Sequence, residues 1–155
     1  MFDVNISKGE SYKESKIFTK GSKIVTGKLP WGKIGMSICY DLRFPSLYRK
    51  LSLKGVNMIS IPAAFTRPTG RSHWRTLIKA RAIENLSFVF APAQCGINSK
   101  TRKTYGHSMI VSPWGEIIAE MEGKPGTISA EIDTSDVLKV RKMIPSYKGT
   151  SIEKK

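Results

Sequence analysis

Short apolar runs alternate with apolar residues at helical spacing through the middle of the chain. Three of the runs predict strands, over residues 33–38, 56–61 and 86–91. Between them, the helical spacing predicts one helix over 44–54, with Gly55 as its stop. A second predicted helix begins at an N-cap Ser72 and runs to about Asn85. The order is βαβαβ, which indicates an α/β layer structure.

The two ends of the chain follow a different pattern. Residues 1–32 are polar and rich in turn formers, which predicts a connecting stretch with one or two strands. The last third predicts three further strands, over 108–111, 116–120 and 127–132. Residues 133–136 are expected to cap a closing helix that ends at Met143. We therefore predict one domain over 1–143, an α/β fold with a mixed sheet and helices stacked on one face, and a polar tail over 144–155.

Composition narrows the class of protein. The formal net charge of +14 invites a nucleic-acid partner, but the lysines and arginines are scattered from Lys8 to Lys155 and no basic cluster is interleaved with aromatic residues. We expect no dedicated nucleic-acid partner and a generic basic surface. Cys39 and Cys95 form no spaced framework, and no apolar run approaches the length of a membrane span. These features predict a cytoplasmic protein with no membrane partner.

The predicted sheet leaves one face without a cover. Helices on one face bury only half of a sheet, and this chain offers few further helices for the other half. We expect that a second sheet from another part of a longer protein covers this face, or that a second copy of the chain does.

Cys39 stands at the end of an apolar run and at the start of a helical spacing. A strand that delivers a thiol to a tight turn suits a nucleophile, because a following helix N-terminus favours the thiolate. A small apolar filler of the core is the alternative for such a residue. His73 and His107 are candidate bases for a papain-like pair, although neither has a carboxylate beside it in the sequence and both suit a packed structural position.

Several short motifs occur in one order along nearly the whole chain. They are Phe2-Asp3-Val4, Gly9-Glu10-Ser11 with Glu14-Ser15, Pro30-Trp31-Gly32-Lys33-Ile34-Gly35, Ile38-Cys39-Tyr40-Asp41-Leu42-Arg43-Phe44-Pro45, Pro62-Ala63-Ala64-Phe65, His73-Trp74, Ala80-Arg81-Ala82-Ile83-Glu84-Asn85, Gly106-His107-Ser108 and Pro113-Trp114-Gly115-Glu116. In this order and spacing they resemble the carbon–nitrogen hydrolases of the nitrilase superfamily, especially the omega-amidase-like branch.

The resemblance implies an α-β-β-α sandwich and a Glu-Lys-Cys triad, with no cofactor and no metal. It implies that Cys39 is the nucleophile and that the backbone N–H of Tyr40 belongs to the oxyanion hole. It also implies that Glu14 is a second, supporting glutamate and that Phe65 lines the acyl pocket. Read without the resemblance, Glu14 suits an exposed carboxylate, and Phe65 suits the core nearly as well as a pocket.

Four further positions in the motifs are expected to be structural. Asp41 and Arg43 are predicted to tie the turn around the cysteine together by hydrogen bonds. Arg81 and Glu84 are predicted to form an ion pair on one helix face. We expect no catalytic role for these side chains.

The resemblance also implies what this chain lacks. Members of the family are nearly twice as long, and the triad Glu and Lys lie in the front half, the Lys shortly before the segment that matches Phe2-Asp3. We therefore predict amide hydrolysis of a small molecule through a Cys39 thioester, with the chain inactive alone and either pairing with a missing N-terminal half or forming a homo-oligomer. The alternative is a non-catalytic interaction module. Amide, nitrile and carbamoyl substrates remain open.

Overall fold

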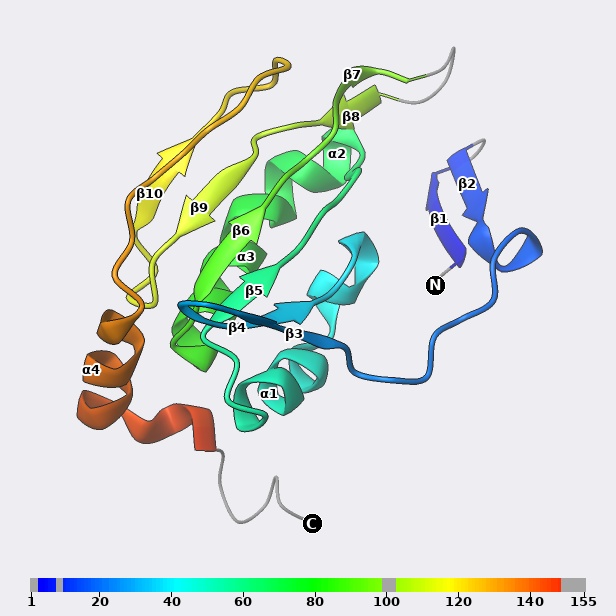
Figure 1. Cartoon of the computed structure of the whole chain (residues 1–155). Coiled ribbons are helices and arrows are strands. Elements are labelled where there is room, and N and C mark those ends of the chain that lie inside the picture. The colour runs from blue at the N-terminus through cyan, green and yellow to red at the C-terminus, as the bar shows by residue number, and fades with distance from the viewer. Residues whose placement is uncertain (1–2, 8–9, 99–102, 149–155) are drawn as a thin grey trace.

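The chain is built around one six-stranded mixed sheet. The computed structural model describes residues 3–7, 10–98 and 103–148 (Figure 1). The sheet runs in the order β10-β9-β6-β5-β4-β3. Its strands are β3 (Thr26–Leu29), β4 (Gly32–Met36), β5 (Met58–Ser60), β6 (Phe88–Ala91), β9 (Met109–Val111) and β10 (Ile117–Glu120). The pairs β4-β5 and β5-β6 are parallel and the other pairs are antiparallel, which confirms the predicted mixed sheet.

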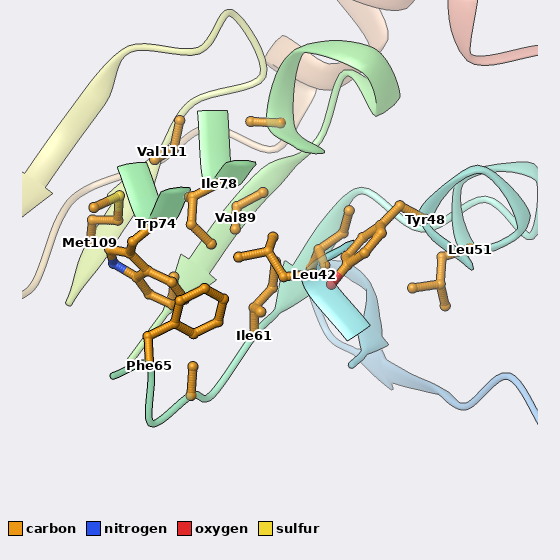
Figure 2. Close-up of a cluster of buried hydrophobic side chains, with 14 of the residues drawn as sticks. Leu42, Tyr48, Leu51, Ile61, Phe65, Trp74, Ile78, Val89, Met109 and Val111 are labelled. Atoms are coloured by element: carbon orange, nitrogen blue, oxygen red, sulfur yellow. The ribbon is translucent and has the colours of Figure 1, made fainter. Parts of the chain in front are cut away.

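Helices α1 (Pro45–Leu53) and α3 (Arg75–Asn85) cover one face of the sheet. Their buried side chains meet those of the central strands in one apolar cluster, part of which Figure 2 shows. Gly35 of β4 lets α1 approach closely, because a Cβ atom at this position would lie 2.9 Å from Cδ2 of Leu51. Gly55 ends α1 with φ of +78°, so the predicted stop is confirmed.

Helix α4 (Ser135–Met143) packs at the opposite face, near one end of the sheet. Its Val137 is 1% exposed and packs against Met58 and Phe88. The next residues along these strands, Ile59 and Val89, belong to the cluster on the α1/α3 side, and successive strand residues point to opposite faces. The Nη2 atom of Arg141 donates to the backbone oxygens of Val56 and Asn85, at 2.7 and 3.0 Å. Helix α4 therefore closes only one end of this face.

The rest of the opposite face is partly open, as the pattern of the chain indicated. Met36 of β4 is 50% exposed and Ile118 of β10 is 40% exposed. Apolar side chains at these positions gain stability from a cover.

The predicted start of the second helix is wrong. The helix expected to begin at Ser72 begins at α2 (Arg67–Thr69) and continues through one π-helical turn over Gly70–Trp74 into α3. Pro68 lies in the first turn, where its fixed φ suits a helix start. Thr66, not Ser72, is the N-cap residue.

The strand predicted over 127–132 does not form. This segment alternates between exposed and half-buried residues, and Ile132 packs against the buried cluster of Met58, Phe88 and Val137. The alternation records which side faces the protein, but a strand also needs a hydrogen-bonded neighbour, and the segment is not paired with β10 at the sheet edge.

The N-terminal region holds more strands than predicted. Besides the hairpin β1 (Asp3–Ser7) and β2 (Glu10–Lys13), the segment before residue 32 contributes β3 to the main sheet. A second small hairpin, β7 (Cys95–Ile97) with β8 (Lys103–Tyr105), was also not predicted. In both cases the strand pairs antiparallel with the next strand along the chain, as in a hairpin.

The packed structure continues past Met143. A 3₁₀ turn over Pro145–Lys148 follows α4, and its Tyr147 ring lies 4.6 Å from the Arg141 guanidinium. The remainder of the predicted tail, 149–155, lies outside the described residues. None of the described helices combines the length and the apolar character that a membrane crossing requires.

The start of α4 carries a pH-dependent cap. Asp133 accepts hydrogen bonds from the hydroxyl and the backbone N–H of Ser135, at 2.6 and 2.8 Å, and these bonds lower the pKa of Asp133 below its usual value. The carboxylate form is therefore favoured by folding. The contribution of this carboxylate to stability is complete above the pKa of about 3.9 that the side chain has in the unfolded chain. This contribution is lost as pH falls through the lower pKa that the side chain has in the folded chain.

We expect the Asp133→Asn substitution to lower Tm slightly at neutral pH. The difference in Tm between the native chain and this variant should shrink as pH falls below about 4. Thermal unfolding followed by circular dichroism across a pH series measures it. A difference that stays constant down to about pH 2 would contradict the cap.

Candidate active site

Cys39 begins a 3₁₀ turn that connects β4 to α1. The turn spans Cys39–Arg43, and its first residue has φ of +47°. This left-handed conformation is rare for a residue with a side chain and costs about 1–3 kcal/mol, so the surrounding structure must impose it. Such strain at a half-buried thiol is what a strand–turn–helix nucleophile requires.

Hydrogen bonds hold the N-terminal end of the 39–43 turn. The Cys39 N–H donates to the carbonyl oxygen of Pro62 at 2.8 Å, which ties the turn to the segment after β5. The Asp41 carboxylate accepts the N–H of Ile38 at 2.9 Å, so the predicted tie by Asp41 is confirmed. Ser37, just before the turn, is 4% exposed and its hydroxyl lies 2.9 Å from that of Tyr48. Burial raises the pKa of Tyr48 well above its usual range, which keeps this hydroxyl protonated.

Arg81 of α3 holds the C-terminal end of the turn. Its ion pair with Glu84, at 2.8 Å, confirms the prediction. The sequence did not indicate its second contact, in which the guanidinium donates to the carbonyl oxygen of Leu42. This contact links residues that are far apart in the sequence, which is why no local pattern reveals it.

Arg43 joins the side chains around the turn. Its guanidinium lies 5.3 Å from the centroid of the Tyr40 ring and 5.2 Å from that of Phe65, and it donates to Nδ1 of His73 at 3.3 Å. The hydrogen bond described for the Arg43 side chain goes to His73, outside the turn, and its contact within the turn is with the Tyr40 ring, so the predicted tie of the turn by hydrogen bonds from Arg43 stays a prediction.

Cys39 borders a cavity of about 780 Å³. The lining comes from two stretches, within residues 18–25 and 36–41, together with Leu47. Several lining side chains are apolar, and four of them stay largely exposed: Phe18, Val25, Met36 and Ile38. A cavity of this size with an apolar rim accommodates a small organic molecule next to the thiol.

The three other predicted site residues are Phe65, Glu14 and Tyr40. Phe65 is 5% exposed and packs on Trp74, with ring centroids 4.9 Å apart (Figure 2), and it is not in the lining of the cavity. Its substrate-binding role stays a prediction. Glu14 begins a 3₁₀ turn after β2, but its side chain falls outside what the structure describes. The Tyr40 amide keeps its predicted oxyanion role as a prediction too.

The two histidines do not line the cavity. His107 has φ of +59°, stacks on Tyr105 at 4.1 Å and has its Nδ1 3.3 Å from Oε1 of Glu120. The same carboxylate also accepts two bonds from Arg75. These contacts favour structural roles over a papain-like pair. Within the described part of the chain, no group of His, Cys, Asp and Glu side chains could hold a metal ion.

Comparison with known proteins identifies the family. The carbon-nitrogen hydrolase family model matches residues 1–142. A deaminated glutathione amidase of Synechocystis is 47% identical over 148 residues, which are 94% of this chain and 54% of that protein. The chain spans about half the length of the curated relatives it matches.

Solved structures agree with this match. The Caenorhabditis elegans NitFhit protein is 38% identical with a TM-score of 0.88, over 100% of this chain and 38% of that one. Saccharomyces cerevisiae Nit3, a member of branch 10 of the nitrilase superfamily, is 35% identical with a TM-score of 0.80, over 85% of this chain and 49% of its own. This chain therefore belongs to the carbon-nitrogen hydrolase family of the nitrilase superfamily.

Proposed function

We propose that this chain supplies the nucleophile of an enzyme that hydrolyses the amide of a small molecule to a carboxylic acid and ammonia or an amine. The observation that carries the proposal is that Cys39 takes a left-handed backbone conformation at the border of a cavity. Family membership and an amidase among the relatives support the same chemistry.

The proposed reaction passes through a thioester. The Cys39 thiolate attacks the amide carbon, the tetrahedral oxyanion is held by the Tyr40 N–H, and the C–N bond breaks as the amine leaves with a proton. Water then attacks the thioester, releases the acid and restores the thiol. Glu14 supports the site as a carboxylate, and Phe65 borders the acyl group.

We propose that the general base Glu and the oxyanion-stabilising Lys come from a polypeptide segment that this sequence does not contain. The open part of the sheet face around Met36 and Ile118 supports a cover by such a segment, and a second copy of the chain is the other occupant that we consider. The chain alone is then inactive. Because no disulfide joins Cys39 and Cys95, the proposed location is a reducing one, the cytoplasm.

The test uses the chain alone and the chain mixed with the complementary half of a full-length relative. Each sample is incubated with a small amide, ammonia is measured, and a rapid quench is followed by peptide mass mapping. We expect ammonia and an acyl group on Cys39 in the mixture only. An acyl group on Cys95, or ammonia without any acyl-cysteine, would contradict the proposal.

A non-catalytic interaction module is the second candidate. The half-open sheet face favours it, since apolar surface of this kind promotes association. Sedimentation of the chain alone and of the mixture separates the two candidates when it is combined with the ammonia assay: a stable complex without turnover favours the module.

A further inference from the structure

Arg81 is a cation inside the core. The residue is 5% exposed, and among the described residues it is the only buried one that carries a charge. A buried charge is unfavourable unless its donors are all satisfied by well-placed acceptors. The positions of those acceptors therefore indicate what the charge holds in place.

Two of its three nitrogen atoms point to one backbone atom. Nε and Nη2 lie 2.9 and 2.7 Å from the carbonyl oxygen of Leu42, and Nη1 donates to Glu84 at 2.8 Å. Leu42 is fully buried in the 39–43 turn, near the end where carbonyl groups of a helical turn lack a donor within the turn. Arg81 supplies that donor from a different helix.

The same guanidinium also touches the support beneath the turn. It lies 5.2 Å from the centroid of the Tyr48 ring, and the Tyr48 hydroxyl contacts Ser37 just before the turn. Ser37 in turn donates through its hydroxyl to the carbonyl oxygen of Ser60 on β5. Contacts from α3, α1 and β5 thus meet at both ends of the turn that holds Cys39 at positive φ.

We infer that Arg81 is a positioning residue for Cys39: its planar guanidinium locks the far end of the 39–43 turn and so maintains the left-handed conformation that presents the thiol and the amide of Tyr40. This inference rests on the proposed nucleophilic role of Cys39. The fork of Arg is required, because one group must reach Leu42 and Glu84 in fixed directions at the same time.

The test measures the reactivity of the thiol and needs no turnover. The full 155-residue chain is alkylated with iodoacetamide across a pH series, and mass mapping gives the rates at Cys39 and at Cys95 separately. In the Arg81→Met variant we expect the Cys39 rate at pH 7 to fall roughly tenfold, because the turn no longer holds the thiol in one conformation beside the cavity. The Cys95 rate should stay within about twofold, as for a thiol outside the turn.

Arg75→Met is the matched control. Like Arg81, Arg75 lies on α3 and donates two hydrogen bonds to one acceptor residue, here Glu120. Its replacement should leave the alkylation rates of both thiols unchanged. Equal Cys39 rates in Arg81→Met and the native chain would overturn the inference. So would a parallel change at both cysteines in a folded variant, because that indicates general loosening.

Arg81→Lys decides the matter if Arg81→Met does not fold. The ammonium keeps the charge and one donor for Glu84 or Leu42, but it loses the fork. We expect the alkylation rate of Cys39 to lie between the native rate and the roughly tenfold lower rate expected without the guanidinium. The circular dichroism spectrum should be unchanged. A native rate in Arg81→Lys would overturn the inference. Failure of the thioester experiment alone would not, because alkylation requires neither substrate nor the absent Glu and Lys.

Discussion

Replacing Cys39 with alanine is expected to abolish amide hydrolysis by the assembled protein, with a loss in kcat of at least about 10³-fold. The reason is that Cys39 is the only cysteine in the described lining of the cavity, and neither histidine belongs to that lining. Ammonia release under saturating amide measures the effect, and the acyl adduct on the thiol should disappear with it.

Cys95→Ala is the control for this experiment. Cys95 lies on β7, is half-buried like Cys39, and is absent from the cavity lining. Its removal should leave ammonia release within about twofold of the native value. Substantial activity in Cys39→Ala would show that the nucleophile lies elsewhere, and the proposed function would fail.

The second large effect concerns stability. Trp74 is fully buried between α3 and the sheet, packs on Phe65, and donates through Nε1 to the carbonyl oxygen of His107 at 2.7 Å. Its truncation to alanine removes a large apolar side chain and leaves a cavity, and it also leaves that carbonyl without this donor. We expect the free energy of unfolding to fall by about 3–5 kcal/mol. Urea unfolding followed by circular dichroism measures it.

Trp114→Ala provides the comparison at the surface. Trp114 lies in the turn between β9 and β10 and is 53% exposed, so its removal should change the free energy of unfolding by about 1 kcal/mol or less. Trp74→Phe separates packing from the hydrogen bond, because it keeps most of the apolar volume. Similar losses for both tryptophan-to-alanine variants would contradict the assignment of Trp74 to the centre of the core.

Much of the fold was predictable because it depends on local patterns. The apolar run that ends just before Cys39 corresponds to β4, and the run that ends at Ile61 contains β5. The helical spacing after Phe44 corresponds to α1. Asp133 and Ser135 begin α4 as predicted, because a cap involves neighbouring residues only. The same locality explains the ion pair of Arg81 with Glu84, which lie one turn apart.

The failures arise where distant parts of the chain decide. The strand expected over 127–132 has the right alternation but no paired neighbour among the described strands. His107 appeared to lack a carboxylate, yet β10 brings Glu120 next to it. Phe65 packs on Trp74, and its expected place at the acyl pocket stays a prediction.

By itself the sequence determined the family motifs, the alternation of strands and helices, and the position of Cys39 between a strand and a helix. These properties depend on residue identity and on contacts within a few residues, which a linear pattern records. Only the tertiary structure decided that Cys39 takes a left-handed conformation beside a cavity and that Arg81 reaches the carbonyl of Leu42. Such contacts join residues about forty positions apart, and their free energy exists only once the sheet and its helices have packed.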